Sequence, residues 1–452
     1  MIAPARIAAY EALTAVSAGS ADLPTAIAFA RAGLRDDRDR ALAADIAAGV
    51  LRWRGAIDHV VVAVARRPLE RLDPEVIEIL RLSAYQLLHH SRVPASAVVD
   101  DAVKLTRRTG KASAAGFVNA VLRTISRKQA QLPLPPRPPD CSVADAALDY
   151  LSVTLSHPRW LSARWLNRLG FEAAEAWMTF NNGPAPLTLR VNRLKTDRAE
   201  LEARLASEGV VVRRGRYAPD ALIVDEGHPL RGDGLATGAF VVQDEASQLV
   251  AALAGASPGR RALDTCASPG GKTTFMAAAM HNEGLLVACD ARPRRIDLLR
   301  QTVAASGATN VRILQADLLQ PLPFTCQFDS VFVDVPCSGL GTLRRDPDIK
   351  WRRQEGELAA LAGKERAMLG HASAAVRPGG LLVYATCSSE PEEDEEVAAA
   401  FLSEHPDFDA IDAGDVAPAL PRDVVDARGH LRTLPHVHGL EAFFGAAFRR
   451  QT

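Results

Sequence analysis

The sequence predicts a multidomain protein: an all-α N-terminal region, a small α+β insert, and an α/β domain with a mostly parallel sheet. Three observations support this prediction. Apolar residues recur at helical spacing up to about residue 128, and five prolines crowd residues 131–140. After residue 261, short apolar runs alternate with helix-length segments, as parallel strands joined by helices do. At 452 residues the chain is long enough for two or three domains.

The N-terminal region, residues 1–130, is predicted to be helical throughout. The proline-rich residues 131–140 cannot continue a helix or join a sheet, because proline lacks the backbone donor that both need. We therefore expect a stiff linker at 131–144 and a domain boundary there. The clearest expected helices are residues 41–52, 74–89 and 95–106.

The segment 145–255 mixes helical and strand patterns, which predicts a small α+β subdomain. Expected helices are 159–169, 171–181 and 197–208, and expected strands are 187–191, 210–212 and 221–224.

The remaining segment, 256–452, is predicted to be the α/β domain. Its clearest helix is residues 364–376, and its expected strands are 262–264, 285–290, 311–315, 331–335 and 381–386. In a parallel sheet of this kind, ligands bind beyond the carboxyl ends of the strands, so the residues that follow each strand are the candidates for a site.

Charge is distributed unevenly along a chain whose net charge is only −1. Residues 1–130 carry 19 Lys and Arg against 13 Asp and Glu, and the remainder carries 34 against 41. A basic N-terminal domain fits contact with an acidic polymer such as RNA. An Arg-rich surface that is simply solvated fits as well, and charge alone does not separate the two.

Composition narrows the class of protein further. Six cysteines without close regular spacing argue against a disulfide scaffold and against a zinc site, and we expect no metal. No run of eighteen apolar residues is present, so no membrane span is expected. Charged residues interrupt residues 1–30, which argues against a signal peptide. We expect a cytoplasmic protein.

A glycine-rich loop follows the first expected strand of the α/β domain. Residues 263–273 read LDTCASPGGKT, and adjacent glycines before a helix allow a ligand close to free backbone amides. A P-loop would need glycine where Cys266 stands, and no G-x-G-x-x-G motif is present. Nucleotide hydrolysis and dinucleotide binding are therefore disfavoured.

Two acids follow the next two strands. Asp290 ends the second strand, where a carboxylate can accept hydrogen bonds from ribose hydroxyls, and Asp317 follows the third, where it can meet an adenine amino group. Two acids without a phosphate cradle suit a nucleoside that carries no phosphates, and S-adenosylmethionine is the simplest candidate. The alternative, that each acid only caps the following helix, holds for either alone better than for both.

Two cysteines stand at the ends of the last two expected strands. Residues 333–339 read VDVPCSG and residues 384–388 read YATCS, which places Cys337 and Cys387 at one edge of the sheet. A cysteine thiolate is a strong nucleophile, so this placement indicates covalent chemistry. The lone cysteines Cys141, Cys289 and Cys326 are interpreted as small buried hydrophobic residues, and Cys266 as the same apart from its backbone.

These motifs resemble those of the Sun (Fmu-type) family of RNA cytosine-5 methyltransferases. The resemblance rests on residues 266–272, 334–337 and 386–387, and extends to 242–247, 344–351 and 391–395. The N-terminal segment resembles the RNA-binding NusB fold through residues 80–87 and 117–123. The fusion is similar to bacterial small-subunit rRNA methyltransferases, and it implies a NusB-like domain, an RNA-binding α+β subdomain and a Rossmann-like methyltransferase domain.

The resemblance assigns roles to individual residues. It implies that Cys387 attacks carbon 6 of the cytosine, that Cys337 assists product release, and that Asp334 contacts the cytosine edge. The rival assignment makes Cys337 the nucleophile, and the residues alone do not separate the two. The expected S-adenosylmethionine site comprises Cys266, Ala267, Ser268, Pro269, Gly270, Gly271, Lys272, Asp290, Asp317 and Asp334.

Three further expectations concern the surroundings of the site. Lys272 is expected to support the cofactor loop or the active-site acid. The acidic run 390–396 is predicted to be the first turn of a helix, where the macrodipole favours negative charge, and is given no catalytic role. Arg190, Asn192 and Lys195 are weaker candidates for RNA contact at the rim.

The expected substrate is a flipped cytosine in small-subunit rRNA, and we expect a monomer. Methylation of tRNA is the rival of the same chemistry, and the NusB-like extension favours rRNA only by analogy. A non-catalytic RNA-binding assembly factor is the rival of another class, and the intact cofactor loop with two cysteines argues against it.

Overall fold

The computed structural model describes residues 2–141, 143–324 and 328–452. The chain divides into two compact units. The first consists of Met1–Pro184 together with Leu343–Glu355, and the second of Ala185–Thr342 together with Gly356–Thr452. The proline-rich segment therefore lies within the first unit, which continues to Pro184.

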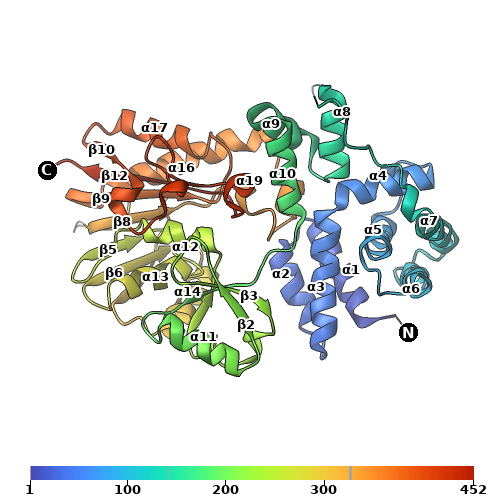
Figure 1. The fold of residues 1–452 in the computed structure, drawn as a ribbon, viewed down its shortest axis with the longest axis horizontal. Helices are drawn as coiled ribbons and strands as arrows, with labels where there is room; N and C mark the ends of the chain where they lie inside the picture. Colours follow the sequence, from blue (N-terminus) through green and yellow to red (C-terminus); the bar gives the residue numbers. More distant parts are fainter. Residues whose placement is uncertain (1, 142, 325–327) are drawn as a thin grey trace. The chain divides into compact units, whose positions relative to one another are not determined.

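The first unit is helical, as predicted (Figure 1). Its core packs apolar faces of the N-terminal helices, and Leu132 and Leu134 of the proline-rich segment lie against that core. Its α-helices are α1 (Pro4–Ser17), α2 (Leu23–Arg31), α3 (Asp37–Arg52), α4 (Arg54–Ala65), α5 (Pro74–His89), α6 (Ala95–Arg108), α7 (Ala115–Arg127), α8 (Ala144–Asp149), α9 (Arg159–Leu169), α10 (Phe171–Asn182) and α15 (Ile349–Arg352). Its shorter helical turns are η1 (Leu69–Arg71), η2 (Ala112–Ala114), η3 (Gln129–Gln131) and η4 (Tyr150–Thr154).

Local signals explain where these helices begin. Helix α5 starts with Pro74, whose fixed φ suits the first turn, and its bounds agree with the prediction. Helix α3 begins four residues earlier than expected, because the Asp36 side chain accepts a hydrogen bond from the Arg38 amide and caps it.

A four-stranded antiparallel sheet opens the second unit, in the order β2-β3-β1-β4. One face of it packs against α11 through Leu201 and Leu205, which confirms the expected α+β subdomain. Its elements are β1 (Thr188–Val191), α11 (Arg198–Ser207), β2 (Val211–Arg214), β3 (Ala221–Glu226), η5 (Pro229–Arg231) and β4 (Phe240–Val242).

The main sheet of the second unit has the order β10-β12-β9-β8-β5-β6-β7, and β11 also pairs with β12. The run from β7 to β9 is parallel, while β10, β11 and β12 pair antiparallel. The strands are β5 (Arg261–Asp264), β6 (Leu285–Asp290), β7 (Val311–Gln315), β8 (Phe328–Asp334), β9 (Val376–Thr386), β10 (Phe408–Ile411), β11 (Leu431–Thr433) and β12 (Phe443–Arg450).

Helices cover both faces of this sheet, as predicted (Figure 1). Neighbouring residues alternate between two cores: Leu382 faces the core of α16 and α17, and Val383 faces that of α13 and α14. The helices are α12 (Glu245–Ala252), α13 (Gly271–Ala279), α14 (Pro293–Ser306), α16 (Leu358–Ser373), α17 (Glu395–Glu404), α18 (Ala413–Val416) and α19 (Pro435–His438), with the turns η6 (Leu340–Thr342), η7 (Glu355–Glu357) and η8 (Arg422–Val424).

The strand order creates a reversal point between β5 and β8. From β5 the chain proceeds outward through β6 to β7, and from β8 it proceeds the other way to β9. Loops that leave the carboxyl ends of β5 and β8 therefore diverge and leave room between them, which is where open α/β sheets bind ligands.

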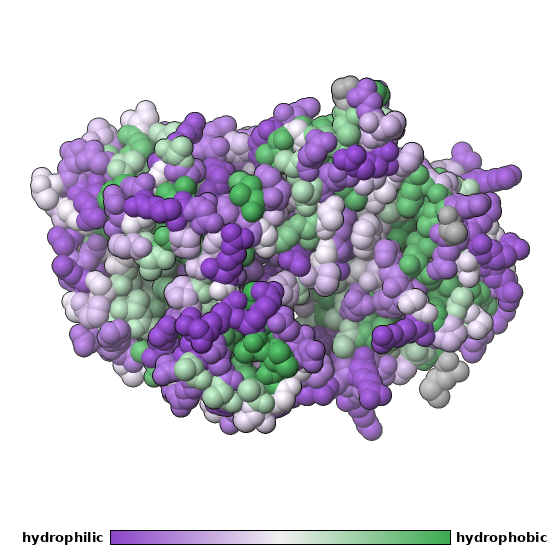
Figure 2. Space-filling model, in the orientation of Figure 1, coloured by the Kyte–Doolittle hydropathy of each residue, from purple (hydrophilic) through white to green (hydrophobic). Residues whose placement is uncertain are grey.

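On the face that Figure 2 draws, hydrophilic side chains cover most of the surface, with smaller hydrophobic areas among them. Among the described residues, no helix is both long and apolar enough to cross a membrane.

Candidate active site

The glycine-rich loop connects β5 to α13 at the reversal point. Gly270 has φ of +110°, in the left-handed region, and a Cβ there would crowd Thr302 and Leu299 of α14 at 3.0–3.1 Å. Glycine is therefore required for the sharp entry into α13. The Ala267 amide donates to the Cys289 carbonyl at 2.8 Å, which ties the loop to β6 and leaves the first amides of α13 for a ligand.

The two predicted acids follow β6 and β7. Asp290 is buried, and its carboxylate accepts from the amides of Ser268, at 3.3 Å, and Arg292, at 3.2 Å. Asp317 is exposed and accepts from the Leu319 amide at 3.0 Å. Each acid thus bonds an amide two residues ahead, as a turn-capping residue does. Asp290 additionally holds the glycine-rich loop.

Lys272 is committed to an acid rather than to solvent. Its Nζ donates to Asp334 Oδ2 at 2.6 Å and lies 5.8 Å from the Phe443 ring centroid. Burial lowers the pKa of Lys272, but the Asp334 carboxylate outweighs burial and raises it, with a smaller contribution from Cys387. Because the Lys272 amine is already paired with Asp334, it is not available to bind a phosphate. The hydrogen-bond donors of the loop therefore fit a ligand without phosphates.

The two cysteines predicted to share an edge lie side by side. β8 and β9 are parallel neighbours, with Asp334 opposite Ala385. The loops that follow bring Cys337 Sγ to 3.2 Å from Cys387 Sγ, and the Cys387 amide donates to Cys337 Sγ at 3.3 Å. Cys387 also raises the pKa of Lys272, so the two thiols lie near the Lys272–Asp334 pair.

The Cys337 thiol is held neutral. The hydrogen bond to Cys387 and burial raise the pKa of Cys337 well above its ordinary value, and the charge of Glu393 acts in the same direction. At neutral pH, Cys337 therefore carries a proton beside Cys387.

The acidic run 390–396 differs from its prediction. Helix α17 begins only at Glu395, whereas Glu390, Glu393 and Asp394 are fully buried before it. The prediction of a helical first turn is therefore wrong for these three residues. Their burial is compensated because the cysteine loops and Arg432 supply donors that a solvated helix end would not need.

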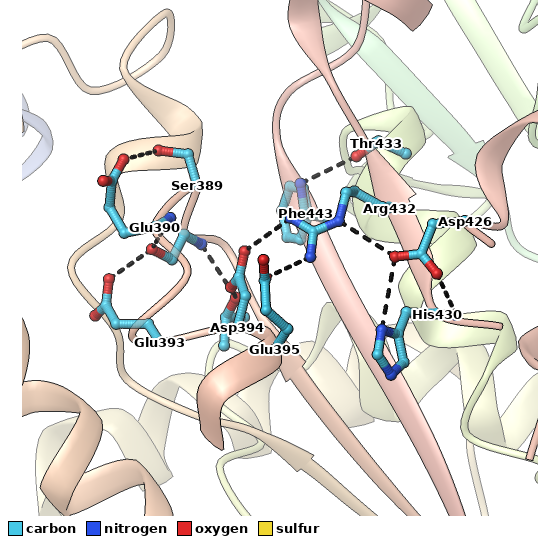
Figure 3. Close-up of polar contacts among 12 residues, drawn as sticks. Ser389, Glu390, Glu393, Asp394, Glu395, Asp426, His430, Arg432, Thr433 and Phe443 are labelled. Carbon is cyan, nitrogen blue, oxygen red and sulfur yellow. Dashed lines mark hydrogen bonds and ion pairs between the residues drawn. The ribbon is translucent and has the colours of Figure 1, made fainter. Parts of the chain in front are cut away.

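Arg432 lies between Asp394 and Glu395 on one side and Asp426 on the other (Figure 3). It contacts Glu395 at 2.6 Å, Asp426 at 3.5 Å and Asp394 at 3.6 Å. Asp394 also accepts from Thr386 Oγ1 at 2.6 Å, so it fixes the residue before Cys387. Burial raises the pKa of Asp394 well above its ordinary value, and Arg432 opposes that rise.

Glu393 was not among the predicted site residues, although it contacts both cysteine loops. Its Oε1 accepts from the Ser338 amide at 2.7 Å and its Oε2 from Ser388 Oγ at 2.5 Å. The one signal available in the sequence is that a serine follows each of the two cysteines.

The predicted RNA contacts in the α+β subdomain are only partly accessible. Arg190 is buried and donates to Thr274 at 2.8 Å, and burial lowers its pKa to about 10. Asn192 is buried and donates to the Gly238 and Ser306 carbonyls. The prediction of RNA contact is wrong for these two residues, which hold the subdomain to helices α13 and α14. Lys195 is exposed.

The remaining cysteines differ in burial. Cys289 lies in the core, as predicted, and burial raises its pKa to about 12. Cys141 and Cys266 are only partly buried, and Cys326 lies outside the described residues. In the part of the chain that the structure describes, no three His, Cys, Asp or Glu side chains group as metal ligands would.

Comparison with family models divides the chain into three matched regions. The model described as 16S rRNA methyltransferase RsmB/F matches residues 251–449, the NusB family model matches 3–127, and the RsmF/B-like ferredoxin-like domain matches 157–231.

Curated relatives extend over most of the chain. The probable ribosomal RNA small subunit methyltransferase B of Bacillus subtilis is 34% identical over 418 residues, 92% of this chain and 91% of the relative. The ribosomal RNA small subunit methyltransferase B of Pseudomonas putida is 34% identical and covers 89% of each chain.

Solved structures agree with these relatives. The crystal structure of PH0851 superposes with a TM-score of 0.81 at 26% identity, covering 100% of this chain and 99% of that one. A methyltransferase homolog protein from Pyrococcus horikoshii has a TM-score of 0.59 at 25% identity and covers 68% of this chain and 100% of its own.

Proposed function

Because the chain belongs to the RsmB/F family of 16S rRNA methyltransferases, we propose that it methylates carbon 5 of a cytosine in small-subunit rRNA. The observation that carries the chemistry is the pair of thiols 3.2 Å apart beside the Lys272–Asp334 ion pair.

The two cysteines divide one covalent cycle between them. Carbon 5 of cytosine is a weak nucleophile until a thiolate adds to carbon 6 and makes it enamine-like. Cys387 forms that bond as a thiolate, and carbon 5 then takes the methyl group. A solvent base next removes the carbon 5 proton, the freed electron pair re-forms the C5–C6 double bond, and Cys387 leaves carbon 6 as a thiolate. Cys337, held as a neutral thiol against Cys387, assists this release by donating a hydrogen bond to the departing thiolate.

Asp334 and Lys272 act on the other edge of the base. The Asp334 side chain is 24% exposed, so one carboxylate can accept from the cytosine amine while it stays paired with Lys272. The pair keeps the carboxylate fixed in place, which orients the ring for attack by Cys387.

S-adenosylmethionine, when bound, supplies the methyl group. The residues that would hold it are the loop Cys266–Lys272 with Asp290, Asp317 and Asp334. This donor set fits, because it combines carboxylates and helix amides and its one lysine is already paired with Asp334. Asp290 ties the loop to the end of β6, and Gly270 lets the loop turn into α13.

The helical N-terminal domain would dock a neighbouring RNA element, while the target cytosine leaves its stack to reach the thiols. The excess of positive charge over residues 1–130 supports this division. Every proposed catalytic group comes from one chain, so the proposed reaction does not require a second copy of the protein.

Incubation with labelled S-adenosylmethionine and unmodified small-subunit rRNA tests the function. We expect labelled 5-methylcytosine in the rRNA with the wild-type protein and none with Cys387→Ala. Unmodified tRNA in parallel tests the rival substrate, and preferential labelling of tRNA would overturn the rRNA assignment. RNA binding without any labelled 5-methylcytosine would leave the non-catalytic assembly factor as the function.

A further inference from the structure

We propose that Glu393 is a positioning residue that clamps the two cysteine loops together and thereby serves the release step. The inference rests on the methyl transfer proposed above, and it adds a residue to that site. It starts from three features of the structure: a repeated Cys-Ser pair, a carboxylate that spans it, and an unequal attachment of the two loops.

The Cys-Ser pairs form two parallel contacts between the loops. Cys337 Sγ lies 3.2 Å from Cys387 Sγ, and one residue further on Ser338 Oγ lies 3.3 Å from Ser388 Oγ. A change in the distance between the two serines would therefore also change the distance between the two sulfur atoms.

Glu393 closes the serine side. One oxygen accepts from the Ser338 amide at 2.7 Å and the other from the Ser388 hydroxyl at 2.5 Å, so one carboxylate spans both loops. Both bonds are to a charged acceptor, which makes them stronger than neutral hydrogen bonds. The Glu390 amide donates to Ser388 Oγ at 3.1 Å and orients that hydroxyl toward Glu393.

The clamp is rigidly mounted, in the buried turn that Figure 3 shows. Glu393 is 0% exposed, and Tyr384 of β9 donates its hydroxyl to the Glu393 carbonyl at 2.5 Å and to Glu365 at 3.1 Å. Burial, together with the neighbouring Glu393 charge, raises the pKa of Glu365 to about 10. Glu365 is therefore neutral at pH 7, so its carboxyl group adds no charge beside Glu393.

The two loops depend on Glu393 unequally. Cys387 follows β9 directly, after Thr386, which is bonded to Asp394. Cys337 lies three residues beyond the end of β8, after Pro336, which has no amide to donate. Glu393 accepts from the backbone amide of Ser338 but only from the side chain of Ser388, so its loss frees Cys337 more than Cys387, and release suffers more than attack.

The test compares Glu393→Ala, Glu393→Gln and Ser388→Ala with Cys337→Ala as reference. Glu396→Ala is the matched control, because Glu396 is an exposed acid of the same run. The assays are turnover on unmodified rRNA, the fraction of protein in a covalent RNA adduct on a denaturing gel, and capture by rRNA containing 5-fluorocytosine, which traps the attacking thiolate and bypasses release.

For Glu393→Ala we expect turnover to fall about tenfold or more, the loss typical of a hydrogen bond to a charged group. The adduct should accumulate as in Cys337→Ala, while 5-fluorocytosine capture stays within about threefold of wild type. Glu393→Gln keeps an acceptor for the Ser338 amide and a donor for Ser388 Oγ, so it should retain most turnover. Ser388→Ala removes one arm and should accumulate less adduct, and Glu396→Ala none.

Three results would overturn the inference. In the first, Glu393→Ala loses both 5-fluorocytosine capture and turnover and forms no adduct, while Cys337→Ala does accumulate the adduct. A merely structural role of Glu393 predicts this result. Another is that Glu393→Gln is as impaired as Glu393→Ala. The third applies if Glu393→Ala does not fold: adduct and turnover in Ser388→Ala that equal those of wild type would then overturn the proposal. Failure of the proposed function itself is distinct, because wild type would then make no 5-methylcytosine and Cys337→Ala no adduct.

Discussion

At the scale of single residues, the thiol pair depends on the state of each partner. Cys337 stays protonated chiefly because it is hydrogen-bonded to Cys387 and partly buried. A thiol in that state is a poor nucleophile, since the thiolate is the attacking species. The raised pKa of Cys337 therefore favours the proposal that Cys337 acts in release and Cys387 in attack.

Titration of Cys337 tests this directly. Alkylation by iodoacetamide, followed peptide by peptide with mass spectrometry, should give Cys337 a pH midpoint above that of a free cysteine. Because the largest cause of the raised pKa is Cys387, the midpoint should move down in Cys387→Ala. An unchanged midpoint in that variant would show that burial alone governs Cys337.

The titration of Asp264, at the end of β5, leads to a prediction about how stability depends on pH. Burial raises its pKa to about 7 in the folded state, against about 3.9 in an unfolded chain. Between these values the folded state binds the extra proton, so this group's contribution to stability is complete below about pH 4 and is lost as pH rises through about 7.

Asp264→Asn should remove this pH dependence, because asparagine stays neutral and can still accept from Thr273 Oγ1. The difference in the free energy of unfolding, variant minus wild type, should grow between about pH 5 and about pH 8, to at most ~4 kcal/mol. Asp297→Asn, at a side chain 66% exposed, is the control. A difference that shrinks with rising pH would contradict the raised pKa.

At the scale of elements, the buried acidic turn is organised by one cation. Asp394 is 1% exposed, and Arg432 is the charged partner that lies beside it, Glu395 and Asp426 (Figure 3). Removal of one member of a buried ion pair leaves the other uncompensated, which costs more than the pair contributes.

Arg432→Met should therefore lower the free energy of unfolding by about 3 kcal/mol, measured by thermal or denaturant unfolding. Adding Asp394→Asn should recover part of that loss, because it removes the stranded carboxylate while keeping an acceptor for Thr386. Additive losses in the double variant would show that the two residues are not coupled.

The elements also show what the sequence could predict. β6 and β7 have the predicted bounds, because each is an apolar run with a turn on either side. β12 was not predicted, although it lies between β9 and β10: Gly445 and two alanines weaken its strand pattern, and Gly445 is needed where Leu253 and Leu431 approach. Glu393 was missed because its partners are 55 and 5 residues away and only the fold joins them.

At the scale of the whole molecule, the first unit includes a segment that follows the loop of Pro336 and Cys337 in the sequence. Leu343–Glu355 belongs to the helical unit, where Trp351 Nε1 donates to the Leu51 carbonyl at 2.6 Å. Lys350, 1% exposed, donates to the Arg52 carbonyl at 2.9 Å. The helical unit is therefore built from two stretches of chain, which the predicted domain boundaries did not include.

Deletion of residues 1–130 should therefore also destabilise the folded conformation of residues 343–355. We expect limited proteolysis to cut within that segment at least about tenfold faster than in the full chain, because its backbone and side-chain partners on α3 are gone. Trp351→Ala in the full chain should have a smaller effect of the same kind. Equal protection in the deletion variant would contradict a helical unit built from both stretches.

The proposed reaction depends on the roles of the two thiols, and one gel measures both roles. Cys337→Ala and Cys387→Ala proteins are each incubated with S-adenosylmethionine and unmodified small-subunit rRNA, then denatured and separated. We predict a covalent protein–RNA band with Cys337→Ala and none with Cys387→Ala. A band with Cys387→Ala and none with Cys337→Ala would reverse the assignment and contradict the central claim.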